Sequence, residues 1–231
     1  MSQRRSGQSR GWLIALPLLL ALSVPLRAWL DRELRLVGES TGADVTAAEA
    51  VIPARVARLL AGGFQAVLAD WYWIRTLNYF GRQAREQEKL DLRRMPQLAG
   101  LLRLTVALDP QQLAAWRFGA FFLGEAALSD AGDARRFVTD GIRENPREWR
   151  LRADLAFICW RSGRYREAAL AWQQAAALPG APAWIEPMAA ITLGQGGEVE
   201  TARIIFRRLI ESTDDPFVRE VSRFQLDQLE R

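Results

Sequence analysis

A spacing of about 34 residues recurs through the second half of the chain and constrains its fold more than any other feature. One such step from Ala168 reaches Ala134 in one direction and Ala202 in the other, and Gly163 is joined to Gly197 in the same way. Three further sets share the spacing: Val138, Trp172 and Phe206; Gly141, Ala175 and Leu209; and Phe121, Leu155 and Ala189. Small residues recur where helices approach closely and large ones where a gap is filled, so the spacing predicts a stack of helical units that each contact their neighbours.

One unit carries the fullest motif. It reads Leu155-Ala156, then Gly163-Arg164-Tyr165-Arg166-Glu167-Ala168, then Trp172 and Ala175. This pattern resembles the tetratricopeptide repeat, a family with Leu-Gly, then Gly-x-Tyr, then an alanine, an aromatic residue and a second alanine at these offsets. The resemblance implies pairs of helices stacked into a short α-solenoid.

Neighbouring units keep part of the motif. The following unit is similar at four positions: Gly197, Val199, Ala202 and Phe206. The preceding unit ends at Asn145-Pro146 and has Ser129 in place of the turn glycine. Asp109-Pro110 resembles the end of a still earlier unit, displaced by two residues from the register of the later repeats. The resemblance covers residues 95–216 and says more about the fold than about the function.

Apolar spacing and helix breakers predict an all-α chain. Most prolines stand at or between the predicted helix ends, where a missing N–H does little harm, and Pro187 indicates that its helix begins near Trp184 or later. The predicted helices are 46–61, 64–88, 95–108, 113–127, 132–144, 149–161, 165–177, 184–194, 198–211 and 216–230. The predicted segments are an N-terminus at 1–11, a transmembrane anchor at 12–30, a spacer at 31–45, a helical segment at 46–94, repeats at 95–216 and a capping helix at 217–231.

The chain contains no histidine, and Cys159 is its only cysteine. Ser-His-Asp and Cys-His catalysis, His-ligated zinc and His-ligated haem are therefore excluded, as is a disulfide within the chain. The net charge is +4, but arginines alternate with acidic residues along most of the sequence. A nucleic-acid surface calls for basic residues clustered on one face, so we expect no nucleic-acid partner.

The predicted anchor begins with an uncharged run from Gly11 to Leu26. Residues 12–30 approach the roughly 20 residues needed to cross ~30 Å of hydrocarbon, and Trp12 and Trp29 then lie near the two interfaces. The alternative is a cleaved signal peptide, but the small-residue site around 21–23 is poor and Pro25 follows closely. We therefore expect an uncleaved anchor.

The charges around the anchor predict its orientation. Arg4, Arg5 and Arg10 precede it, whereas the charged residues that follow it largely cancel. Under the positive-inside rule, residues 1–11 are cytoplasmic and residues 31–231 lie across the membrane, which in a bacterium with two membranes is the periplasm. The sequence therefore predicts a single-pass protein of the inner membrane.

The segment 69–81 stands apart from the repeats because its aromatic residues, at 71, 72, 73, 79 and 80, surround most of a helix. Such a distribution predicts burial on several sides. The segment is similar to one in bacterial membrane-anchored repeat proteins, a similarity that implies no activity. Asp70 is a candidate general acid, but it has no catalytic partner within sequence reach, and pairing with Arg75 is its more ordinary role.

Other candidate chemistry is also absent from the sequence. The acidic residues at 86, 88 and 91 are interspersed with basic ones, which is typical of a solvated helix face rather than a metal site. The glycines between Gly194 and Gly197 lack the Lys-Ser/Thr of a phosphate-binding loop and predict an inter-helix turn. Cys159 is predicted to pack as an inert apolar residue. We expect no catalytic residue, no cofactor and no metal.

The family resemblance implies a concave groove lined by the first helix of each pair. Transferred position by position, it places six candidate partner-binding residues there: Trp116, Arg150, Phe157, Trp160, Arg161 and Trp184. Gly119, Leu123 and Ile191 would lie beside them. Trp, Phe and Arg dominate binding hot spots, although the alternative is that some of these side chains pack against neighbouring helices.

The sequence as a whole predicts a membrane-anchored scaffold or accessory subunit that binds protein partners of the bacterial envelope and catalyses nothing. A second route to partners is the aromatic helix at 64–80, which would dock on membrane-embedded proteins if its apolar side chains were exposed. Two alternatives remain: a carboxylate-based enzyme acting on envelope polysaccharide, and the same binding module released into the periplasm after cleavage.

Overall fold

The computed structural model describes residue 25 and residues 53–87, 91, 95–126 and 131–231. The chain separates into two compact units, Met1–Ile52 and Pro53–Arg231. The predicted anchor, with Trp12 and Trp29, and the predicted spacer fall outside the described residues apart from Pro25. Among the residues that are described, no helix is both long enough and apolar enough to cross a membrane.

The described part of the second unit is all-α. In chain order its α-helices are α2 (Ala54–Ala61), α3 (Gln65–Glu86), α4 (Pro96–Leu108), α5 (Leu113–Ala126), α6 (Ala131–Glu144), α7 (Trp149–Arg161), α8 (Tyr165–Ala176), α9 (Glu186–Gln195), α10 (Val199–Ser212) and α11 (Pro216–Glu230). From residue 64 onward the predicted helix ends are confirmed to within two residues. The 3-10 turn η2 (Ala183–Ile185) precedes α9, whose start at Glu186 confirms the reading of Pro187.

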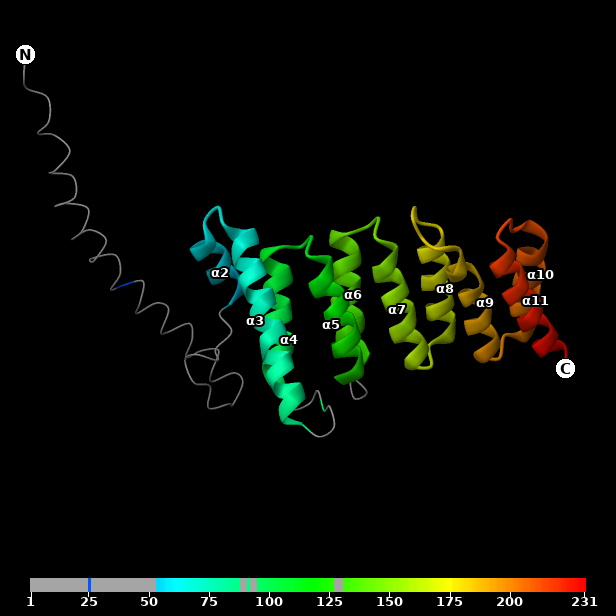
Figure 1. Cartoon of the computed structure of the whole chain (residues 1–231), viewed down its shortest axis with the longest axis horizontal. Coiled ribbons are helices and arrows are strands. Elements are labelled where there is room, and N and C mark those ends of the chain that lie inside the picture. The colour runs from blue at the N-terminus through cyan, green and yellow to red at the C-terminus, as the bar shows by residue number, and fades with distance from the viewer. Residues whose placement is uncertain (1–24, 26–52, 88–90, 92–94, 127–130) are drawn as a thin grey trace, which may run out of the picture. The chain divides into compact units, whose positions relative to one another are not determined.

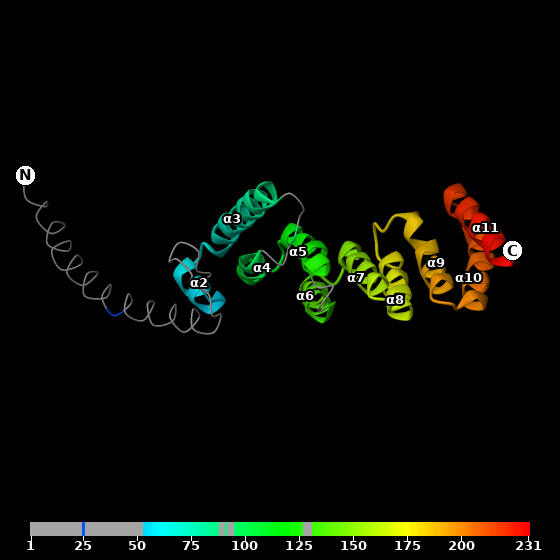
Figure 2. The ribbon, with the colours of Figure 1, turned by 90° about the horizontal axis from the view of Figure 1, so that it is seen from below.

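Successive helices of this unit pack against one another in antiparallel fashion (Figure 1). Four consecutive pairs form, α3 with α4, α5 with α6, α7 with α8, and α9 with α10, and the second helix of each pair contacts the first helix of the next. At the ends of this series, α2 contacts α3 and α4, and α11 contacts α9 and α10 (Figure 2). The arrangement is consistent with a helical repeat.

The second helices of three pairs begin at the spacing that the sequence repeats, at Ala131, Tyr165 and Val199. Two of the turns before them contain Gly163 and Gly197, with φ of 71° and 86°. This left-handed conformation is unfavourable for residues with a Cβ atom, so glycine lets the chain reverse within a few residues. The period read from the sequence is therefore also a period of backbone geometry.

Burial follows the same period on the second helices. One column is completely buried: Ala134, Ala168 and Ala202. The column of larger residues is fully or nearly buried: Val138, Trp172 and Phe206. An alanine lets two helix backbones approach, and the large side chain one turn later fills the space between pairs. Both predicted columns are confirmed.

One predicted column is wrong. Phe121 was aligned with Leu155 and Ala189, yet it is 54% exposed whereas Ala189 is buried. The first helix of the earlier unit is displaced by two residues, as Asp109-Pro110 indicates, so Gly119 is the residue equivalent to Leu155. When the step between the first helices of the earlier two units is taken as 36 residues in place of 34, three columns of fully or nearly buried residues appear. They are Ala115, Leu151 and Ile185; Ala120, Ala156 and Ala190; and Leu123, Cys159 and Leu193.

Helix α3 buries one face rather than several. The rings of Trp73 and Phe80 meet the ring of Phe118 on α5 edge-on, with centroids 5.4 and 5.3 Å apart. Tyr72 is also buried, but Trp71 points outward and is half exposed. The prediction of burial on several sides is therefore wrong, because among the described helices α3 has neighbours on one side only.

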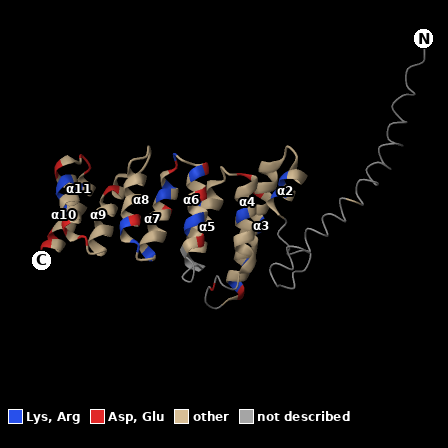
Figure 3. Ribbon diagram, turned by 180° about the vertical axis from the view of Figure 1, so that it is seen from behind, with Lys and Arg blue, Asp and Glu red and all other residues tan. Residues whose placement is uncertain are grey.

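Basic and acidic residues occur together along the helices (Figure 3), and arginine–carboxylate pairs link successive second helices or the residue just before one. Arg103 on α4 contacts Asp133 on α6 at 2.5 Å, and Arg135 on α6 contacts Glu167 on α8 at 2.9 Å. Arg166 on α8 pairs in turn with Glu198, the residue before α10. Exposed pairs of this kind contribute about 0–1 kcal/mol each, so they select the alignment of neighbouring helices more than they stabilise the fold.

Two helix glycines offer a matched test of this packing. A Cβ atom on Gly119 would lie 2.3 Å from the Phe137 ring, whereas one on Gly81 would meet nothing within 4 Å. We expect Gly119→Ala to lower the free energy of unfolding by about 1–3 kcal/mol through overpacking. Gly81→Ala should raise it by up to about 1 kcal/mol, because alanine is the better helix former. Chemical denaturation followed by circular dichroism measures both; equal effects would contradict the close approach of α5 and α6.

Candidate functional site

The predicted partner-binding residues that reach the surface are centred on α7. Helices α5 and α7 pack side by side, and we call the exposed side of α5, α7 and the η2–α9 segment the first-helix face. Its side chains, as the structure exposes them wholly or in part, are Arg117, Phe121, Arg150, Asp154, Phe157, Trp160, Arg161 and Trp184. Five of these are predicted site residues: Arg150, Phe157, Trp160, Arg161 and Trp184.

An aromatic pair lies at the end of α7. Phe157 and Trp160 are three residues apart and therefore share one side of the helix, with ring centroids 5.6 Å apart and ring planes inclined by 33°. They remain 40% and 37% exposed. The guanidinium of Arg161 lies 5.9 Å from the Phe157 ring centre, within the range of a cation–π contact. The three side chains thus form one apolar surface with a cation at its margin.

Trp160 is held in place by the next pair of helices. Its indole N–H donates a hydrogen bond to the side-chain oxygen of Gln195, the last residue of α9, at 2.5 Å. This bond fixes the indole plane and satisfies its only polar group within the protein. A ring that is both exposed and oriented loses little conformational entropy on binding a partner.

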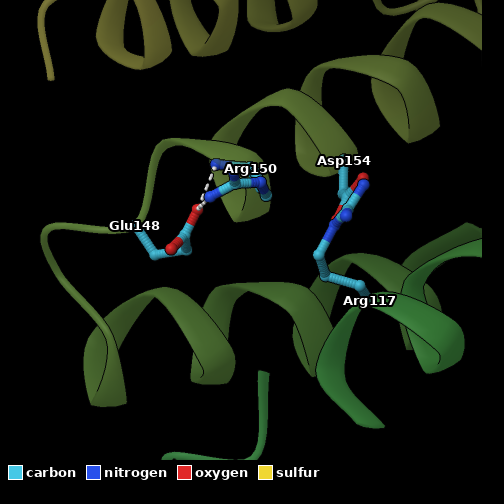
Figure 4. Close-up of polar contacts among 4 residues, drawn as sticks. All are labelled: Arg117, Glu148, Arg150 and Asp154. Atoms are coloured by element: carbon cyan, nitrogen blue, oxygen red, sulfur yellow. Dashed lines mark hydrogen bonds and ion pairs between the residues drawn. The ribbon is translucent and has the colours of Figure 1, made fainter. Parts of the chain in front are cut away.

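Polar contacts join α5 to α7 further along the same face (Figure 4). Arg117 on α5 donates from Nε to the Asp154 carboxylate on α7 at 3.1 Å. Burial raises the pKa of Asp154 above its ordinary value of 3.8, Arg117 acts in the opposite direction, and Glu148 adds a smaller upward effect. Desolvation is thus the largest influence on this carboxylate, although it has an arginine partner.

Arg150 is engaged at the start of α7. Glu148 precedes the helix and accepts hydrogen bonds from the Arg150 backbone N–H at 3.2 Å and from its guanidinium at 2.9 Å (Figure 4). The guanidinium also lies 4.6 Å from the centre of the Trp149 ring. These contacts cap the helix and hold Arg150 against it.

Trp116 does not belong to the surface, which corrects its predicted place in the groove. It is 5% exposed, its ring centre lies 4.7 Å from that of Phe137, and its indole N–H donates to the Pro110 carbonyl at 2.9 Å. The two-residue displacement of this unit turns Trp116 inward against Gly141 on α6. Trp184, by contrast, is 43% exposed, with its ring centre 6.4 Å from that of buried Trp172.

Sequence reasoning missed Phe121, Arg117 and Asp154. Phe121 and Phe157 are 36 residues apart, which is the repeat spacing plus the two-residue displacement. The displacement seen at Asp109-Pro110 was therefore the signal that would have placed Phe121 on this face. No comparable signal marked Arg117 and Asp154, because their contact joins positions far apart in the sequence, on two different helices. A contact of that kind depends on how the helices are placed against each other.

The other polar groups that could suggest a site are engaged in contacts within the protein or are buried. A pocket of about 400 Å³ between α2, α4 and α6 is lined by three arginines and three acidic residues, of which Arg103 and Arg136 both contact Asp133. Asp70 accepts a hydrogen bond from the Gln112 amide at 3.2 Å. Burial raises the pKa of the Cys159 thiol, which favours its unreactive form. Among the described residues, no three His, Cys, Asp or Glu side chains cluster to hold a metal.

A second exposed surface is apolar. Its side chains lie on α2, at the start of α3 and along the outer side of α3, and each is at least half exposed. We call this surface the α2–α3 strip; its members are Leu59, Leu60, Phe64, Val67, Trp71 and Ile74. The aromatic helix thus presents part of the apolar surface that its predicted docking role requires.

No family model, curated protein or solved structure matches this chain at a significant level. The case for a function therefore rests on the chain's own residues, on the repeated helical pairs, and on the two exposed surfaces that they carry.

The raised pKa of Asp154 predicts a pH dependence of stability. A carboxyl that binds its proton more tightly in the folded state stabilises the fold below its unfolded pKa, and this contribution is lost as pH rises through the folded pKa. The unfolding free energy of the native chain minus that of Asp154→Asn should therefore fall as pH rises from 3.8 through the higher folded pKa. Denaturant titrations between pH 3 and 7 test this; a rising difference would mean that the Arg117 pair outweighs burial.

Proposed function

We propose that this protein is a membrane-anchored scaffold whose helical pairs form a tetratricopeptide-type solenoid and whose first-helix face binds a protein partner in the bacterial envelope. Residues 12–30 form the anchor, residues 95–216 the repeats, and α11 the cap. The observation that carries the proposal is the exposed, hydrogen-bonded aromatic pair of Phe157 and Trp160 beside Arg161.

The repeat geometry supports the solenoid. Three second helices begin at the repeat spacing of the sequence, and the alanine columns of both helices in these three pairs are buried in register. Glycine turns with positive φ lie at the two positions where the motif has its turn glycine. In solenoids each unit contacts only its neighbours, and the first helices present one extended surface, which is the surface that binds partners.

The chemistry of the first-helix face supports protein binding. Tryptophan and arginine are enriched at the few positions that supply most binding energy, where a partner excludes water from them. Phe121, Phe157 and Trp160 supply apolar area on two adjacent helices, and Arg161 adds a cation at its edge. A complementary partner segment would carry one or two large apolar side chains with a carboxylate nearby.

The charged groups of the face favour binding over catalysis. Asp154 is paired with Arg117, and Glu148 caps α7 while it holds Arg150. Carboxylates used in general acid–base chemistry must exchange protons with a substrate, whereas these two already serve helix capping and helix–helix contact. The alternative of a carboxylate-based enzyme therefore gains no support from this surface.

The proposed location follows from the sequence of the first unit. An uncharged run preceded by three arginines supports a single-pass anchor in the inner membrane, with residues 31–231 in the periplasm. Tethering would raise the effective concentration of the first-helix face for partners in the same membrane. A released form, cut near residue 23, would keep the face and lose this advantage.

Two matched double substitutions test the binding role. We expect Trp160→Ala with Arg161→Ala to weaken partner retention by at least about 30-fold, since a single hot-spot residue contributes about 2 kcal/mol or more. The control is Arg223→Ala with Phe224→Ala, which removes an exposed arginine and an exposed phenylalanine from α11. The tagged full-length protein is extracted in mild detergent, and its co-purifying proteins are quantified by mass spectrometry.

The proposal predicts a stoichiometric set of envelope proteins that survives the control substitutions and is lost with the α7 pair. Circular dichroism should show both variants folded, because all four side chains are exposed. Partners that persist in the α7 variant would move the interface away from the first-helix face. A protein that stays alone even after crosslinking would overturn the scaffold itself.

A further inference from the structure

The α2–α3 strip lies on the exposed side of α3, opposite the side that packs into the core. Phe64 and the α3 residues Val67, Trp71 and Ile74 follow helical spacing along the outer side. The opposite side of α3 buries Ala69, Tyr72 and Thr76 against the rest of the unit. Helix α3 is therefore apolar on both its inner and its outer side over its first three turns, which an isolated surface helix in water does not require.

Basic residues outnumber acidic ones in the segment that carries the strip. The described segment 53–87 contains five arginines, at 55, 58, 75, 82 and 85, against two acidic residues, Asp70 and Glu86. Beyond Ile74 the outer side of α3 continues as Asn78, Arg82 and Arg85, all exposed. The guanidinium of Arg75 lies 5.5 Å from the centre of the Trp71 ring, so a cation also borders the apolar part. Apolar side chains flanked by arginines are typical of a helix that lies in a membrane interface.

The tether brings this surface toward the bilayer. In the proposed topology the anchor ends at residue 30, and only the segment 31–52 separates it from Pro53. The separating segment is 22 residues long, so α2 and α3 are the described helices closest to the proposed anchor along the chain. The exposed apolar area and the basic margin thus lie where lipid is at high effective concentration.

We infer that the α2–α3 strip docks on the surface of an anionic lipid bilayer, with its apolar side chains among the lipid headgroups and upper acyl chains. This inference rests on the proposed anchor and adds a second membrane contact to it. Phe64, Val67, Trp71 and Ile74 enter the interface, and Arg82 and Arg85 face the phosphates. Docking orients the helical pairs relative to the membrane, and it uses none of the residues that form the first-helix face on α5, α7 and α9.

Depth-dependent quenching tests the contact in the full-length protein. A single cysteine is introduced as Ile74→Cys, labelled with an environment-sensitive fluorophore, and placed in nanodiscs that contain phosphatidylglycerol. The matched control is Ile204→Cys on α10, since Ile74 and Ile204 are 57% and 65% exposed. The unsubstituted chain, whose only thiol is buried at Cys159, gives the labelling background.

Spin-labelled lipid should quench about half or more of the emission from position 74, because an interfacial helix buries its apolar face about 5–10 Å deep. Position 204 should be unaffected. Adding Val67→Glu and Trp71→Glu, both at exposed positions, should reduce quenching at 74 to the level seen at 204. Replacing phosphatidylglycerol with a neutral lipid should weaken the quenching.

Three outcomes would overturn the inference. Quenching by lipid at neither position, with position 74 open to aqueous iodide, would show that the strip stays in water. Equal quenching at both would show non-specific adsorption of the whole protein. Protection of position 74 from aqueous iodide without quenching by lipid would show that protein covers the strip. Protection that depends on protein concentration would indicate a second copy, and protection that does not would indicate residues 1–52.

The same samples distinguish this inference from the proposed function. Co-elution of the labelled protein with nanodiscs reports the anchor, whatever happens at position 74. Trp160→Ala with Arg161→Ala should leave quenching at 74 unchanged while abolishing partner retention. Partner retention without lipid quenching at position 74 would refute the docking inference alone. Lipid quenching at position 74 without any partner would refute only the partner-binding role of the first-helix face.

Discussion

Close approach of helix backbones is the constraint on which the rest of this structure depends. Alanine at 134, 168 and 202 on the second helices, and at 120, 156 and 190 on the first, lets each helix lie directly against its neighbours. Where even alanine is too large, Gly119 and Gly141 admit the rings of Phe137 and Trp116. These contacts keep large side chains such as Trp172 and Phe206 in the spaces between pairs, where their burial stabilises the fold by about 1.5–3 kcal/mol each.

Polar contacts also link each helical pair to the next. Arg103 and Arg135 each pair with an acidic residue on the next second helix, and Arg166 pairs with Glu198 just before α10. The first helices are joined instead by Arg117 with Asp154 and by Trp160 with Gln195. Several of the arginines that alternate with acids along the sequence are therefore helix-to-helix contacts, whereas the aromatic residues of α7 and the α2–α3 strip remain exposed.

The sequence predicted the helices well and their exposed faces less well. Helix ends follow local rules, because proline, glycine and apolar spacing act within a few residues, and from residue 64 onward they were right to within two. Trp116 was predicted to line the groove but is buried, and Phe121 was aligned with Leu155 and Ala189 but is exposed. Both errors have one cause, since a two-residue displacement turns an α-helix by about 200°. Trp71 was expected to be buried because aromatic residues surround most of its helix, yet burial needs a neighbouring helix, and among the described helices α3 has none on that side.

The sequence by itself determined the all-α class, the repeat period, the turns at Gly163 and Gly197, and the exclusion of histidine and disulfide chemistry, because each depends on residue identity and local spacing alone. Only the tertiary structure decided which aromatic side chains reach the surface, which arginine meets which carboxylate, and that desolvation outweighs Arg117 in raising the pKa of Asp154. Exposure and desolvation are set by the atoms that surround a side chain, and those atoms come from helices tens of residues away along the chain.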